Sequence, residues 1–134
     1  MVWYSKYMGK KARKILVVED EQALNAAYQL ILERAGYEVS AAYDGSEALE
    51  RVSIFEPELI LLDLKMPRMD GIAFLKEYKA NELGKKKPKI IVFSNFDLQE
   101  EIDQAFSLGA DKYVLKAWAA PKDLLKIVTE AEKL

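Results

Sequence analysis

Two neighbouring acids, Glu19 and Asp20, directly follow an apolar run in the stretch KILVVEDE, residues 14–21. The apolar run at residues 14–18 predicts a strand that is buried on both of its faces. Two like charges at the end of such a strand are unfavourable, since repulsion and desolvation both oppose their ionisation. A cation held between this pair and another acid would offset that cost, so the pair indicates a cation site.

Three further side chains that can take part in chemistry, those of Asp63, Ser94 and Lys116, come directly after later apolar runs. These runs are residues 59–62, 90–93 and 113–115. In an open parallel sheet, ligands bind beyond the carboxyl ends of the strands. We therefore expect three acids, one hydroxyl and one amine to gather at one edge of the fold.

Such a group of oxygen donors suits Mg²⁺, which prefers oxygen ligands at about 2.0–2.1 Å in an octahedron and usually keeps several waters. Asp20 and Asp63 are candidates for direct ligands, and Glu19 for holding a bound water. With the metal present, Asp63 stays ionised and can attack phosphorus as a nucleophile. Lys116 would offset charge on the phosphoryl oxygens, and Ser94 would donate one hydrogen bond to the same group.

Helical segments separate the apolar runs, including a further run at residues 37–42. Their boundaries are marked by residues that begin or end helices: Gly36, Asp44 with Glu47, Asp97 with Glu100, Gly109 and Pro121. Pro67 and Asp70 with Gly71 mark a loop before a helix at residues 72–80. The inward apolar positions are predicted to be Leu24, Ala27, Tyr28, Ile31, Ala48, Leu49, Val52, Leu98, Ile102, Ala105, Phe106, Leu124, Leu125, Val128 and Ala131. Five β/α units with continuous apolar strands predict a three-layer, doubly wound α/β sandwich around a parallel sheet.

The composition limits the alternatives. The chain has 134 residues, which suits one domain, and its 20 basic and 22 acidic residues give a net charge of −2. That balance argues against nucleic-acid or membrane binding by bulk electrostatics. Cys and His are both absent, which excludes disulfides, zinc thiolate sites, thiol catalysis and imidazole bases.

Residues 1–12 are interpreted as an exposed tail that precedes a single domain at residues 13–134. The tail has basic residues but no apolar segment typical of a secretory signal. Its aromatic residues, Trp3, Tyr4 and Tyr7, offer the alternative that the tail packs on a neighbouring molecule. No apolar run approaches the roughly 20 residues that a membrane span needs.

The motifs ILVVEDE, LILLDLKMPRMDG, IIVFSN and GADKYVLK resemble the receiver domain of bacterial two-component response regulators. The resemblance covers roughly residues 13 to 133 and is strongest to single-domain receivers of the chemotaxis-regulator type. It implies a flavodoxin-like (βα)5 fold with the sheet order 2-1-3-4-5. It also implies that Asp63 accepts a phosphoryl group from a histidine kinase with Mg²⁺ as cofactor.

The same resemblance implies a role for each remaining site residue. Glu19 and Asp20 would be the acidic pair, and the backbone carbonyl of Lys65 a further Mg²⁺ ligand. Ser94 would be the switch hydroxyl, Tyr113 the switch aromatic and Lys116 the amine that binds the phosphoryl group.

The implied setting is the bacterial cytoplasm. The implied partners are a sensor histidine kinase or phosphotransfer protein, a downstream protein target, and a second copy of the chain through the fourth helix, fifth strand and fifth helix. Direct contact with nucleic acid or membrane is not expected. The only catalysis expected is the chain's own phosphorylation and dephosphorylation.

The chain departs from the family pattern near the expected phosphoryl group. Ala117 follows Lys116 where the family usually has a proline with a cis peptide bond, and we expect a trans bond here because a non-proline cis bond costs about 2.5–4 kcal/mol. Asn95 stands where a small residue is common. Lys65 and Phe96 occupy positions at which the family tunes dephosphorylation.

Other interpretations stay open from the sequence alone. Glu19 and Asp20 can cap a helix, Ser94 can be an ordinary N-cap, and Tyr113 can be a core aromatic. Two rival functions follow: a binding module that does not use phosphorylation, and a Mg²⁺-dependent phosphatase. Lys65 stands where such a phosphatase typically has a second acid. No output domain is recognisable, so the sequence is either a stand-alone receiver or one cut from a longer chain.

Overall fold

The computed structural model describes residues 13–81, 87–95, 98–118 and 120–134. Its centre is a parallel five-stranded sheet in the order β2-β1-β3-β4-β5. The strands are β1 (Lys14–Val18), β2 (Glu38–Ala42), β3 (Leu59–Asp63), β4 (Lys89–Ser94) and β5 (Lys112–Leu115). The sheet order predicted from the family resemblance is confirmed.

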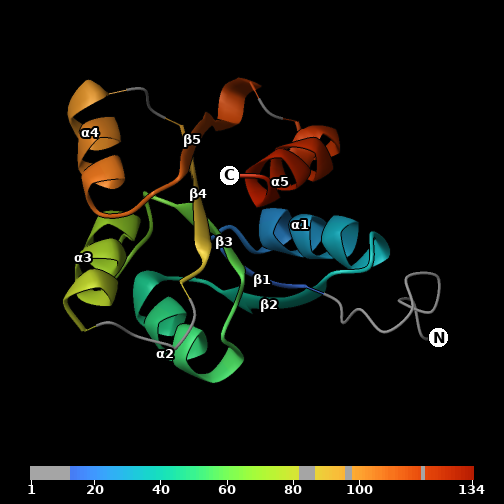
Figure 1. Ribbon diagram of the computed structural model, residues 1–134, viewed down its shortest axis with the longest axis horizontal. Coiled ribbons are helices and arrows are strands. Elements are labelled where there is room, and N and C mark those ends of the chain that lie inside the picture. Colours follow the sequence, from blue (N-terminus) through green and yellow to red (C-terminus); the bar gives the residue numbers. More distant parts are fainter. Residues whose placement is uncertain (1–12, 82–86, 96–97, 119) are drawn as a thin grey trace.

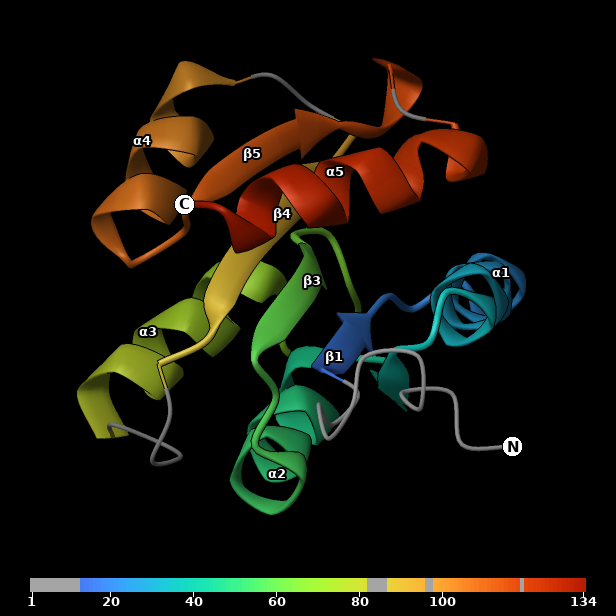
Figure 2. The same ribbon diagram turned by 45° about the vertical axis from the view of Figure 1, so that its right-hand side comes forward.

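Five α-helices cover the two faces of this sheet. They are α1 (Gln22–Arg34), α2 (Gly45–Phe55), α3 (Gly71–Asn81), α4 (Gln99–Ser107) and α5 (Leu124–Glu132), with short 3₁₀ turns at Lys116–Trp118 and Pro121–Asp123. Helices α1 and α5 lie on one face, and α2, α3 and α4 lie on the other (Figure 1). The turned view in Figure 2 shows α5 running beside β4 and β5. The three-layer, doubly wound architecture expected from the sequence is therefore confirmed.

The strands are apolar throughout because both of their faces are buried. In β1, Leu16 and Val18 join the core under α2, α3 and α4, whereas Ile15 and Val17 join the core under α1 and α5. Alternate residues of a strand point to opposite faces, so each strand contributes to both cores. Each of these four side chains is at most 1% exposed.

The helix boundaries follow the predicted signals in part. Asp44 caps α2 by accepting a hydrogen bond from the Glu47 backbone N–H at 2.9 Å, and Glu47 in turn accepts from the Tyr43 N–H at 3.0 Å. Pro121 opens the 3₁₀ turn that leads into α5. The predicted cap at Asp97, like the tail at residues 1–12, lies outside the described residues.

The apolar stripe predicted for α4 is wrong in two places. Of its four predicted inward residues only Ala105 is fully buried, while Leu98 and Phe106 are 54% and 46% exposed. In α5, Leu124 is buried but its neighbour Leu125 is 37% exposed. Adjacent helical residues are about 100° apart around the axis, so both cannot face the sheet. Of the five α-helices in the described part of the chain, α4 has the fewest fully buried residues.

The described helices include none with the length and apolar character that a membrane crossing requires.

Candidate functional site

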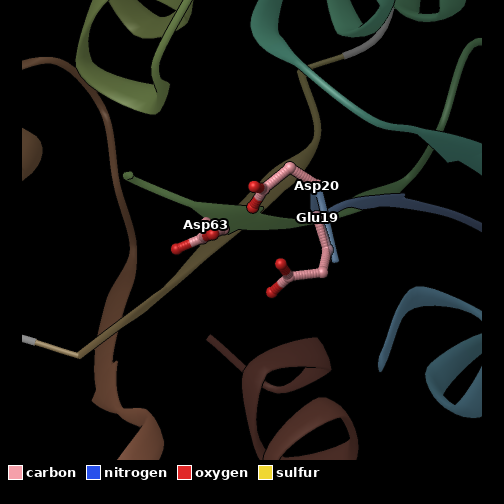
Figure 3. Close-up of side chains that lie close together, drawn as sticks. All are labelled: Glu19, Asp20 and Asp63. Carbon is pink, nitrogen blue, oxygen red and sulfur yellow. The ribbon is translucent and has the colours of Figure 1, made fainter. Parts of the chain in front are cut away.

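Three carboxylates meet at the carboxyl edge of the sheet. Val18 pairs with Leu62 across β1 and β3, so the residues that follow, Glu19 with Asp20 and Asp63, lie side by side. One ligand oxygen from each of these three acids lies within 4.8 Å of the others. Figure 3 shows their side chains projecting from the neighbouring tips of β1 and β3. The predicted convergence of the three acids is therefore confirmed.

The Lys116 amine contacts two of these three acids. Its Nζ lies 2.5 Å from Glu19 Oε1 and 3.4 Å from Asp63 Oδ2. Lys116 opens the 3₁₀ turn directly after β5, and the described chain has no cis peptide bond, so the expected trans bond to Ala117 is confirmed. The absence of the family's usual proline therefore does not prevent the lysine from reaching the acids.

Burial and neighbouring charges shift the pKa values of Asp63 and Lys116. Burial, and next the charge of Glu19, raise the pKa of Asp63 from 3.8 to about 7, although Lys116 acts in the opposite direction. Burial lowers the pKa of Lys116, but its hydrogen bond to Glu19 and the charges of Asp63 and Glu19 outweigh this, so the net shift is upward. Aromatic side chains contribute to the desolvation of Asp63. The rings of Tyr28 and Phe93 line the same pocket as Asp63 and stack with their centroids 6.0 Å apart. A divalent cation bound here would offset the repulsion between the three carboxylates.

The other predicted site residues lie on β4, on β5 and in the loop after β3. Ser94 ends β4 beside Leu115 and is fully buried, which places it at the same edge of the sheet. Tyr113 is half-buried in β5 and packs against the core under α2, α3 and α4. The Lys65 backbone N–H donates to Asp63 Oδ1 at 3.4 Å. The switch roles of Ser94 and Tyr113 and the metal-binding role of the Lys65 carbonyl stay predictions.

Asn25 is a site residue that the sequence reasoning missed. Its side chain is fully buried, and its amide nitrogen lies 3.0 Å from the Glu19 carbonyl, 3.2 Å from the Ala42 carbonyl and 3.4 Å from the Val17 carbonyl. Its Oδ1 accepts a hydrogen bond from Gln29 at 2.8 Å. These bonds fix the turn in which β1 passes into α1 and so orient the acidic pair. The available signal was one polar residue beside the apolar positions of α1.

Replacing Asn25 with Ala should lower the free energy of unfolding by about 2–3 kcal/mol, because the Glu19 and Val17 carbonyls would lose a buried donor. Urea unfolding at neutral pH measures this effect. Gln29→Ala is the matched control, since it removes only the outer bond of the same network, and we expect a loss below about 1 kcal/mol. Equal losses in the two variants would contradict the role of Asn25.

The loop between β3 and α3 is held by close backbone contacts. A Cβ at Gly71 would lie 2.5 Å from the carbonyl oxygen of Asp63, and one at Gly45 would lie 2.6 Å from that of Met69. The Gly45 N–H also donates to the Met69 carbonyl at 2.7 Å. Only glycine permits these approaches, so the start of α2 and the start of α3 fix both ends of the loop that carries Lys65.

An ion pair between an exposed arginine and a buried aspartate holds the same loop. Arg68, in the left-handed backbone region with φ 64°, places its Nε 2.6 Å from Asp44 Oδ2. Asp44 is 2% exposed, and the backbone N–H of Glu47, together with Arg68, holds the pKa of its carboxyl below the ordinary value. The sequence reasoning identified Asp44 as a cap but missed this second role.

Comparison with known proteins shows which family has this sequence and fold. The family description "Response regulator receiver domain" matches residues 15–129. The chain is 38% identical over 109 residues to the alkaline phosphatase synthesis transcriptional regulatory protein PhoP of Bacillus subtilis, covering 80% of this chain and 43% of that protein. It is 33% identical over 114 residues to the transcriptional regulatory protein DltR of Streptococcus agalactiae, covering 85% and 50%. The chain thus spans half or less of the length of these relatives.

Solved structures show the same similarity in three dimensions. A CheY-like response regulator receiver domain protein from Methanospirillum hungatei superposes with a TM-score of 0.80 at 30% identity, covering 92% of this chain and 98% of the other. The chemotaxis response regulator CheY4 of Vibrio cholerae gives a TM-score of 0.80 at 28% identity, covering 90% and 99%. With the matching motifs at the carboxyl edge of the sheet, these findings show that the chain belongs to the response regulator receiver domain family.

Proposed function

We propose that the chain is the phosphoacceptor switch of a bacterial two-component system, with Asp63 receiving a phosphoryl group from a sensor histidine kinase or phosphotransfer protein in the cytoplasm. One observation supports this most strongly: the carboxylates of Glu19, Asp20 and Asp63 converge within 4.8 Å, and the Lys116 amine contacts two of them. With a divalent cation held by the carboxylates, this arrangement would offset the charge of a phosphoryl group as it is transferred.

The donor set fits Mg²⁺, since it consists of carboxylate oxygens and has no nitrogen or sulfur ligand. Asp20 and Asp63 would ligate the ion directly, Glu19 would hold it through a water, and the Lys65 carbonyl would add a further oxygen. When bound, Mg²⁺ supplies positive charge that offsets both the carboxylates and the phosphoryl oxygens.

The residues of the chain then have defined tasks. Asp63 loses its proton to solvent, and one of its oxygens attacks phosphorus while the phosphorus–nitrogen bond of the phosphohistidine breaks. The bonding electron pair leaves with the imidazole. Lys116 offsets charge on the phosphoryl oxygens, and Ser94 donates a hydrogen bond to them. In dephosphorylation, water attacks the same phosphorus and inorganic phosphate leaves, restoring the carboxylate. We expect no turnover of phosphate monoesters.

The response to phosphorylation would pass through Ser94 and Tyr113 to the surface formed by α4, β5 and α5. Phosphorylation can shift a two-state equilibrium only by interacting differently with the two states. Full switching from 1:99 to 99:1 needs about 5.5 kcal/mol, which several charge-assisted contacts can supply. We propose that this surface binds a downstream protein and, as a homodimer contact, a second copy of the chain. The names of PhoP and DltR suggest transcriptional control as the eventual output.

Incubation with acetyl phosphate tests the proposal without knowledge of the kinase. We expect one phosphoryl group per chain in the presence of Mg²⁺ and none in the presence of EDTA, measured by intact-protein mass. Beryllofluoride should bind under the same conditions. If the folded protein neither gains mass nor binds beryllofluoride, the switch function is wrong and the chain is a binding module that works without phosphorylation. Phosphotransfer profiling against the histidine kinases of the source organism would then identify the partner of an active receiver.

A further inference from the structure

An ion pair links the loop beside the phosphoacceptor to α4. Lys65 Nζ lies 2.9 Å from Glu101 Oε1, joining residues that are 36 positions apart in the sequence. The Lys65 side chain is 52% exposed and that of Glu101 is 18% exposed. The lysine can therefore move through solvent, whereas the glutamate is held against the protein in the first turn of α4.

Glu101 depends on this contact. Its second oxygen, Oε2, is buried, and among the described residues it has no hydrogen-bond partner. A mostly buried carboxylate with one satisfied oxygen becomes costly when its cation leaves. Helix α4 buries little surface of its own, because Ala105 is its only fully buried residue in the described part of the chain, and the Lys79 amine contacts only its far end, at the Ser107 carbonyl.

Lys65 is also connected to Asp63. It lies two residues further along the chain, and its backbone N–H reaches Asp63 Oδ1 at 3.4 Å. The Lys65 amine is 2.9 Å from Glu101 and more than half of its side chain is exposed, so it can exchange one anionic partner for another. A phosphoryl group carries a charge of about −1.5 to −2 and three acceptor oxygens, so it can compete with the single carboxylate of Glu101 for this amine.

We propose that Lys65 and Glu101 form a charge latch that holds the first turn of α4 in the unphosphorylated protein and opens when Lys65 turns toward a phosphoryl group on Asp63. This inference rests on the proposed function. Glu101 then loses its cation and turns toward water, which loosens the start of α4. The latch converts charge at Asp63 into a change on the surface that α4 presents. Glu101 acts through Lys65 and is a positioning residue.

Beryllofluoride affinity in saturating Mg²⁺ measures the latch. Glu101→Gln should bind beryllofluoride about two- to fivefold more tightly than wild type, because a half-exposed ion pair no longer has to break. Lys65→Gln should bind no more tightly than wild type, since it loses both the latch and the contact with the phosphate mimic. The effect of Glu101→Gln should vanish in the Lys65→Gln background, as required for residues that act as a pair.

Glu100→Gln is the matched control, because it makes the same charge change at an exposed neighbour in the same helical turn. Its beryllofluoride affinity should stay within about twofold of wild type. Hydrogen exchange of the amides at residues 99–107 should be faster in Glu101→Gln than in Glu100→Gln without any phosphate mimic. The latch is wrong if Glu101→Gln matches the Glu100→Gln control in beryllofluoride affinity and in hydrogen exchange. It is also wrong if Glu101→Gln keeps its effect in the Lys65→Gln background. Failure of wild type itself to bind beryllofluoride would refute the proposed function and the latch together.

Discussion

Asp63→Asn should abolish phosphoryl incorporation and, at the same time, make the metal-free protein more stable. The loss follows because an amide cannot act as the nucleophile that the carboxylate provides. The gain follows because Asp63 is 5% exposed and its charge is opposed by burial and by Glu19. A substitution that removes function while raising stability is typical of a site at which charge repulsion is retained for function.

The pH dependence of this gain has a definite sign. The folded-state pKa of Asp63, about 7, lies above its ordinary value of 3.8, so the native protein holds a proton that the unfolded chain releases. The free energy of unfolding therefore falls, through this group, as pH rises from about 4 to 7. We expect Asp63→Asn to be more stable than wild type by about 2–4 kcal/mol near pH 8, with the difference disappearing near pH 4.

Urea unfolding in EDTA at these two pH values measures the effect. Mg²⁺ should then stabilise wild type more than Asp63→Asn, because the ion would neutralise a charge that the variant lacks. Asp70→Asn is a suitable control, since it makes the same change at an exposed position in the loop after β3. If Asp63→Asn is less stable than wild type at both pH values, the account of a crowded carboxylate is wrong.

Lys116→Met should show the second large effect. Methionine keeps much of the apolar stem but removes the amine that lies 2.5 Å from Glu19 and 3.4 Å from Asp63. Breaking one side of a largely buried ion pair leaves uncompensated charge, and we expect the free energy of unfolding to fall by about 3 kcal/mol in metal-free buffer. The initial rate of phosphorylation by acetyl phosphate should fall about 100-fold, as for the loss of one group that stabilises transferred charge.

The matched control for this prediction is Lys112→Met at the start of β5, which removes an amine that lies 3.3 Å from Glu130 of α5 in a partly exposed ion pair. Its effect on stability should stay below about 1 kcal/mol, and its phosphorylation rate should be unchanged. Addition of Mg²⁺ should restore part of the stability of Lys116→Met, because either cation can offset the carboxylates. If Lys116→Met has the stability and the phosphorylation rate of wild type, the Lys116 amine has no role in the site.

Much of the site could be predicted because its residues are the last of a strand or follow a strand closely. A parallel sheet aligns the carboxyl ends of its strands, so the positions of Glu19, Asp63 and Lys116 in the sequence determine where they meet. The layered architecture was equally predictable, since apolar runs buried on both faces alternate with helical segments, whereas the sheet order was predicted from the family resemblance. These features are local, and their consequences follow from one geometric rule.

The remaining features depend on contacts that no local pattern encodes. In the sequence, Asn25 is one polar residue within a predicted helix. Its hydrogen bonds to three carbonyls form only once β1, β2 and α1 have packed together. The pairing of Lys65 with Glu101 depends on how the loop after β3 meets α4. Phe106 fits an apolar stripe by its spacing but is exposed, because α4 buries only part of that stripe.

The central claim is that Asp63, alone among the three clustered acids, becomes the acyl phosphate. Treatment of the acetyl phosphate-labelled protein with borohydride converts a phosphorylated aspartate into homoserine, and tandem mass spectrometry then locates the product. We expect homoserine at position 63 and nowhere else, with none formed when Mg²⁺ is withheld. Homoserine at position 20, or at an acid outside the cluster while position 63 is unmodified, would contradict the claim.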